Sequence, residues 1–86
     1  MTEIKEDVLG RVCYTELVYG RIRKKLGVDL SNDAIEKMID EIIEETDVRL
    51  FQKIGKNIYI TNADRNVRLT INSYTNRMIT ADRLKK

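Results

Sequence analysis

The sequence contains no histidine, no proline and no tryptophan, and its single cysteine is Cys13. Without histidine, the chain has no imidazole base for catalysis near neutral pH and no ordinary zinc site. One cysteine cannot form an internal disulfide bond, and a cysteine nucleophile would lack the imidazole that usually activates it. We therefore expect Cys13 to be a reduced thiol buried in the core.

Other absences narrow the class of protein further. None of the four glycines has the spacing of a phosphate-binding or dinucleotide-binding loop. No stretch approaches the ~18 consecutive apolar residues of a transmembrane helix, and residues 1–7 are too acidic for a secretory signal peptide. We expect a cytoplasmic protein that is not an enzyme and that uses no metal or organic cofactor.

The residues that are present fit one small globular domain, because 42% of them are apolar and 35% are charged. We expect a single domain over residues 1–86, with a helical part at 3–46 and a β part at 48–84. The charges are placed unevenly: residues 1–50 hold 8 basic and 12 acidic side chains, whereas residues 51–86 hold 8 basic and 2 acidic. This asymmetry indicates either an anionic partner for the C-terminal half or attraction between the two halves within the fold.

The first helical region covers residues 3–26, and its apolar face begins with Ile4. Two internal glycines each weaken a helix by about 1 kcal/mol relative to alanine, so we expect a break near residues 13–15. Thr15 would cap the second piece, and Gly27 would end it. The last turns carry four basic side chains that complement the helix dipole, namely Arg21, Arg23, Lys24 and Lys25.

The second helix has the clearer signals, with Ser31 as N-cap and Asp33 in the first turn. Its apolar positions follow helical spacing, and they are Ile35, Met38, Ile39, Ile42 and Ile43. Its opposite face is acidic and consists of Glu36, Asp40, Glu41, Glu44 and Glu45. We interpret this acidic face as solvated surface rather than as a metal or catalytic site, because exposed acids on helices are common.

After Thr46 the apolar residues recur at every second position, which predicts strands. The predicted strands are 50–54, 57–61, 67–72 and 77–84, with turns at Gly55–Lys56, 62–65 and 72–76. The fold class is α+β, in which an N-terminal helical pair packs on a three- or four-stranded antiparallel β-meander. One face of such a sheet can stay polar.

The polar face of the predicted sheet is the candidate functional surface. The alternation places Tyr59, Arg68 and Thr70 on it, and Lys53 borders the first turn. The candidate anion-binding or nucleic-acid-binding residues are Lys56, Tyr59, Arg68, Arg77 and Arg83. Arginine binds phosphate through paired hydrogen bonds, and tyrosine stacks on bases. The alternative is a basic face that serves solubility alone. We interpret Tyr14 and Tyr19 as packing residues.

Four segments carry a resemblance to a known family. They are CYTELVY followed by RIRKKL within residues 13–26, GKN followed by YITN within 55–62, RLTINS at 68–73, and the segment from Arg77 to TADR at 80–83. Together they span about residues 13 to 84 and resemble a family of short bacterial proteins described only as a domain of unknown function, DUF family 3781. The resemblance implies no activity, ligand or catalytic residue.

Three hypotheses for function remain open. The first is a non-catalytic interaction domain that self-associates as a homodimer or binds a protein partner, with the acidic helix of one copy facing the basic sheet of another. The second is a domain that binds nucleic acid or a nucleotide through the polar face of the sheet. The third is a small enzyme, and a version of the first is a small inhibitor of a larger defence protein. Steep salt dependence of binding would distinguish the second hypothesis, because phosphate binding releases counterions.

Overall fold

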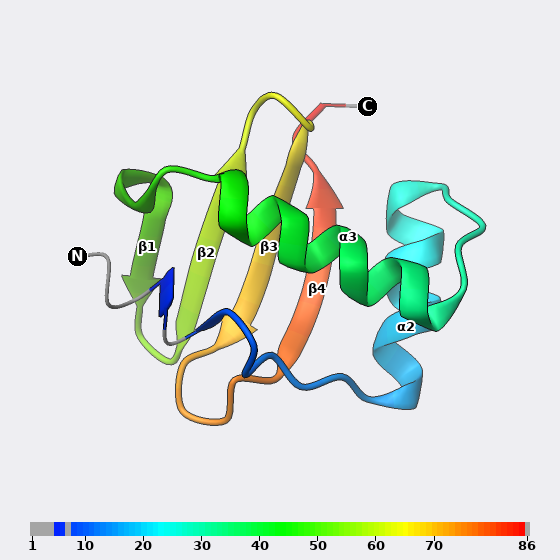
Figure 1. The fold of residues 1–86 in the computed structure, drawn as a ribbon, viewed down its shortest axis with the longest axis horizontal. Coiled ribbons are helices and arrows are strands. Elements are labelled where there is room, and N and C mark those ends of the chain that lie inside the picture. The colour runs from blue at the N-terminus through cyan, green and yellow to red at the C-terminus, as the bar shows by residue number, and fades with distance from the viewer. Residues whose placement is uncertain (1–4, 7, 86) are drawn as a thin grey trace.

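The computed structural model describes residues 5–6 and 8–85 (Figure 1). The elements in chain order are α2 (Glu16–Leu26), α3 (Asn32–Glu45), the 3₁₀ helix η1 (Val48–Leu50), β1 (Phe51–Ile54), β2 (Asn57–Asn62), β3 (Val67–Asn72) and β4 (Met78–Arg83). The strands pair antiparallel in the order β1-β2-β3-β4. The predicted α+β fold, two helices followed by an antiparallel meander, is confirmed. No helix in the described part of the chain is long and apolar enough to span a membrane.

The segment before α2 differs in part from its prediction. The helix start at residue 3, with Ile4, lies outside the described residues. The break near Cys13 is confirmed, because residues 11–15 are not helical. Cys13 instead forms a parallel bridge with Arg77, the residue that precedes β4. Its side chain is exposed, so the prediction of a buried thiol is wrong: a segment in extended conformation turns alternate side chains away from the core.

Helix α2 lies beside β4, at one edge of the sheet (Figure 1). Thr15 occupies the N-cap position without a side-chain hydrogen bond, and Gly27 ends the helix in the left-handed conformation with φ of 66°. Arg21 donates a hydrogen bond from Nη1 to the carbonyl oxygen of Ile79 over 3.3 Å. The helix therefore shields an edge strand, which is a common way to prevent unwanted strand pairing.

Helix α3 crosses one face of the sheet (Figure 1). Ser31 caps it as predicted, because its Oγ accepts the N–H of Ala34 over 3.2 Å. The predicted apolar stripe is buried, with Met38 half-buried at its margin. The sheet contributes its inner face to the same core through Phe51, Ile58, Ile60, Val67, Leu69, Ile71, Met78 and Ala81.

The strands lie close to their predicted positions, with two informative differences. Leu50 belongs to η1 and is exposed, so its assignment to the first strand is wrong; Asp47 caps this turn by accepting the N–H of Arg49. In β4, the register shifts beside Thr70, because Thr70 pairs with Thr80 while Ile71 pairs with Met78. One extra residue in β4 therefore reverses which side chains face the core beyond that point.

Candidate functional site

The face of the sheet opposite α3, here called the outer face, is the surface that the sequence analysis singled out. Its members follow from the strand register. They are Gln52, Ile54, Asn57, Tyr59, Thr61, Arg68, Thr70, Asn72, Thr80 and Asp82. The structure thus brings Tyr59, Arg68 and Thr70 together on one face, as the alternation predicted.

A row of polar side chains runs across the outer face and continues onto α2. Arg68 donates from Nε to the hydroxyl of Thr61 over 3.2 Å and lies opposite Asp82 in the β3–β4 register. On the far side of Asp82, Lys25 of α2 places its Nζ 3.1 Å from the carboxylate. One acid therefore lies between two cations, and the row carries a net positive charge.

Helix α2 extends this basic surface beyond the edge of the sheet. Arg21, Lys24 and Lys25 line a shallow surface hollow of about 530 Å³ together with Gly20. From the sequence, these cations were expected only to complement the helix dipole. The sequence shows that these cations are closely spaced. It does not show that α2 lies beside β4 and so joins them to the outer face.

The end of the outer face that lies away from Arg68 and Asp82 is bounded by the β1–β2 turn and the β3–β4 loop. Ser73 ties them together, because its N–H and its hydroxyl both donate to the carbonyl oxygen of Lys56, over 2.7 and 2.8 Å. Arg77 follows in the same β3–β4 loop, exposed, with its carbonyl oxygen accepting the N–H of Asn72. Tyr74 in this loop is 72% exposed and was not among the predicted site residues. Lys56 and Arg77 thus lie at one end of the candidate site.

Arg83 does not lie on the outer face, so its predicted placement there is wrong. It pairs with Val67, whose side chain is buried on the α3 side. Its guanidinium donates to the carbonyl oxygen of Leu26 over 2.9 Å and to that of Arg65 over 3.4 Å. The cause is the extra residue in β4, since uninterrupted alternation would put Arg77 and Arg83 on the same face.

The basic side chains of the outer face are largely free of acidic partners. Among residues 5–6 and 8–85, ion pairs join Arg65 to Glu41 and Glu45, Lys25 to Asp82, and Arg49 to Asp47. Within those same residues, no ion pair includes Lys56, Arg68 or Arg77, nor Arg21 or Lys24 of α2. These charges are available to an external anion.

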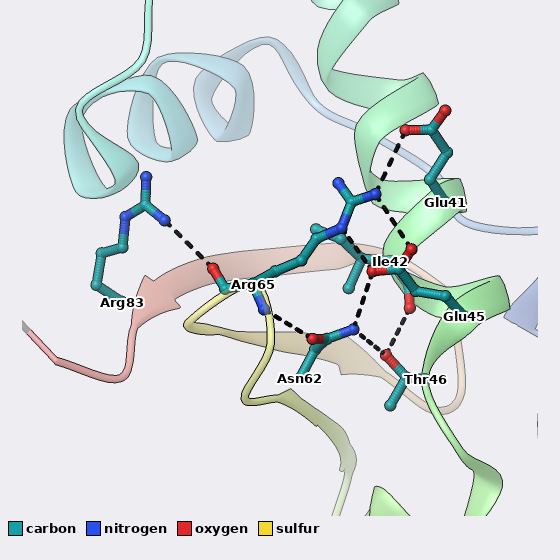
Figure 2. Close-up of polar contacts among 7 residues, drawn as sticks. All are labelled: Glu41, Ile42, Glu45, Thr46, Asn62, Arg65 and Arg83. Carbon is teal, nitrogen blue, oxygen red and sulfur yellow. Dashed lines mark hydrogen bonds and ion pairs between the residues drawn. The ribbon is translucent and has the colours of Figure 1, made fainter.

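A second polar cluster lies where α3 ends above the β2–β3 turn (Figure 2). Asn62, 5% exposed, donates from Nδ2 to the hydroxyl of Thr46 over 3.0 Å and accepts the N–H of Arg65 over 2.9 Å. Thr46 in turn donates to the carbonyl oxygen of Ile42 over 2.5 Å. This cluster satisfies buried polar groups and fastens the end of the helix to the turn, which is a structural role.

Arg65 closes this cluster with charge. It donates to both carboxylate oxygens of Glu45, over 2.5 and 3.1 Å, and lies 3.8 Å from Glu41 (Figure 2). The hydrogen bond from Arg65 lowers the pKa of the Glu45 carboxyl. Here the basic C-terminal half does attract the acidic helix, which is the internal alternative left open by the charge asymmetry.

In the rest of the acidic face of α3, Asp40 and Glu44 are exposed, as interpreted from the sequence, and Glu36 is half-buried. Tyr19 donates a hydrogen bond to Glu36 over 2.5 Å, which raises the pKa of Tyr19 to about 12. Tyr19 also stacks on Tyr14 with ring centroids 5.4 Å apart, so the interpretation of both as packing residues is confirmed. The pKa of Asp40 is raised, first by burial and then by the charges of Glu36 and Glu44.

Comparison with known proteins identifies a family but no function. The family model described as "Protein of unknown function (DUF3781)" matches residues 7–82. No curated protein and no solved structure matches the chain. The match agrees with the resemblance carried by the sequence segments, and it leaves function to be argued from the surface itself.

Proposed function

The chain belongs to the DUF3781 family of proteins of unknown function, so its function is argued from its surface. From the outer face, we propose that the protein is a non-catalytic domain that binds single-stranded nucleic acid. The observation that carries the proposal is the set of basic side chains that runs from Lys56 and Arg77 at one end, through Arg68, to Lys25 and Arg21 on α2. Most of these charges have no acidic partner among the described residues. A cytoplasmic location, where such ligands occur, is part of the proposal.

The chemistry of this face suits phosphates together with bases. Arg68 and Arg77 can each bind a phosphate with two N–H donors, and lysine adds a point charge. Tyr59 lies on the outer face of β2, opposite Thr70 of β3, and Tyr74 is exposed in the β3–β4 loop. Stacking of a base on an aromatic ring contributes about 1–3 kcal/mol and tolerates any sequence. The combination favours a ligand with accessible bases.

The shape of the face favours single strands over a duplex. The outer face is formed by strands of one sheet, flanked by α2 lying alongside β4 (Figure 1). Reading a duplex requires an element that enters a groove, such as a helix or a two-stranded ribbon. Unstacked bases, in contrast, can lie directly on a sheet surface.

Self-association is the second candidate, and the charge distribution favours it. Asp40, Glu41 and Glu44 lie on α3, which covers the face of the sheet opposite the basic outer face. The acidic helix of one copy is therefore complementary to the outer face of another, and the same complementarity would serve a protein partner, including a larger protein that this chain inhibits. We rank it second because Glu45 and Glu41 already engage Arg65.

Fluorescence anisotropy with labelled oligo-dT, oligo-U and a DNA duplex, at several salt concentrations, tests the first candidate. We expect the single strands to bind more tightly, with log K falling by about 0.7 per phosphate contact for each log unit of salt. The double variant Arg68→Ala/Arg77→Ala should lose this binding and remain folded by circular dichroism.

Lys37→Ala is the matched control, because it removes one exposed cation from α3 instead of from the outer face. It should bind as the wild type does. Equal binding by the double variant and the wild type would refute the site, and concentration-dependent dimers in light scattering without oligonucleotide binding would favour the second candidate.

A further inference from the structure

A cavity of about 320 Å³ opens on the α3 side of the sheet, away from the outer face. Its wall is mostly apolar and is formed by Leu26, Val28, Met38, Ile42 and Val67. These residues come from the end of α2, the loop after it, α3 and β3, so both helices and the sheet meet there. The volume lies at the lower end of the ~300–1,000 Å³ range of small-molecule sites.

Two arginines, Arg65 and Arg83, complete the lining of this cavity. Figure 2 shows Arg65 directed toward the carboxylates of α3 and Arg83 beside the backbone carbonyl of Arg65. The charge of Arg65 is matched by Glu45 and Glu41. Arg83 takes part in no ion pair among the described residues, and its recorded partners are carbonyl oxygens.

The two carbonyl contacts hold Arg83 in place without neutralising it. A guanidinium has five N–H donors, and Arg83 uses one on each Nη atom for Leu26 and Arg65. The remaining donors, including Nε–H, are free for an anion. A fixed cation beside an apolar wall is the arrangement that orients a ligand with one charged end and one apolar end.

We propose that this cavity binds a small amphipathic anion, whose short aliphatic chain lies against Met38, Val28 and Val67 and whose carboxylate or phosphate group binds Arg83. The alternative role of Arg83 is to cap the C-terminus of α2, because a cation there satisfies the carbonyl oxygen of Leu26. Capping uses one donor and does not require an adjoining apolar cavity, so the two roles are separable by experiment.

Titration of the ¹⁵N-labelled full chain with hexanoate, hexyl phosphate and hexanol at constant ionic strength tests the proposal. We expect amide shifts concentrated at the cavity residues, and at least one anion binding about tenfold or more tightly than hexanol, as a charge-assisted hydrogen bond implies. The tighter of the two anions identifies the head group. Arg83→Gln should weaken the anions about tenfold and leave hexanol unchanged.

Two further variants keep the test decisive. Met38→Trp fills the cavity and leaves Arg83 in place, so it should abolish binding of all three compounds even if Arg83→Gln fails to fold. Arg68→Gln, on the outer face, should change none of the three affinities. Shifts spread over the surface, hexanol binding as tightly as both anions, or unchanged anion binding in Met38→Trp would each overturn the proposal. Oligonucleotide binding by Met38→Trp should match the wild type, which separates this site from the outer face.

Discussion

Arg65 and Arg68 lie on either side of the start of β3, yet their side chains meet different environments. Arg65 points to α3, where it binds both oxygens of Glu45 and closes the buried cluster around Asn62. Arg68 points to the outer face, where its recorded contact is the hydroxyl of Thr61. The comparison separates charges that stabilise the fold from charges that are available to a partner. Arg65 binds acidic side chains of the protein itself, whereas Arg68 forms no ion pair among the described residues.

The largest predicted change in stability concerns Asn62, the buried residue of the cluster that Arg65 closes. Asn62→Ala removes the donor to Thr46 and the acceptor for the N–H of Arg65, and it leaves buried polar groups unpaired. We expect a loss of about 2–3 kcal/mol in the free energy of unfolding, measured by urea denaturation. Thr61→Ala, which removes a hydrogen bond on the outer face, is the control and should stay within about 0.5 kcal/mol of the wild type. Equal losses in the two variants would contradict the structural role of the cluster.

Arg65→Ala and Arg68→Ala sharpen the comparison directly. Arg65→Ala should lower the urea midpoint, because it removes the cation that binds Glu45 and leaves that carboxylate with the Asn62 amide as its donor. Added salt should shrink this loss, since the ion pair is partly exposed. Arg68→Ala should change stability by no more than about 0.5 kcal/mol. If Arg68→Ala costs as much as Arg65→Ala, the outer face is not a surface of free charges.

The smallest predicted effect concerns Asp40, which has Glu36 and Glu44 one turn away on either side. Its pKa is raised in the folded state, first by burial and then by these two charges, so the native protein binds this proton more tightly than the unfolded chain does. Its ionisation therefore costs stability as the pH rises through the folded pKa. Asp40→Asn should raise the free energy of unfolding at neutral pH by about 0.5 kcal/mol, and the gain should disappear in acid, where the wild-type carboxyl is protonated. A gain that persists unchanged in acid would exclude the electrostatic cause.

The elements of the fold were predictable because each had a local cause. Ser31 determines where α3 starts, and the spacing of its apolar residues determines which face of that helix is buried. Gly55, with φ of 60°, determines the position of the first turn of the sheet. The antiparallel meander follows from short turns between alternating segments. The edge position of α2 had no such local signal, since it depends on how the helices share the sheet.

The candidate site was predictable only where strand alternation is uninterrupted. Tyr59 and Arg68 lie in regular strands, and both reached the predicted face. Arg83 did not, because the extra residue in β4 leaves no mark in the sequence. Cys13 was misjudged for a related reason: helical periodicity suggested burial, whereas pairing with Arg77 holds the segment extended.

The irregularity in β4 also makes the charge pattern of this protein sensitive to chain length. Beyond Ile79, the extra residue in β4 determines which face of the sheet each side chain of the strand lies on. Loss of a single codon there would exchange Asp82 and Arg83 between the two surfaces, moving a positive charge toward the surface of Arg68 and an acid toward the helices. One indel, without any substitution, could thus redistribute the electrostatics of both proposed binding sites at once.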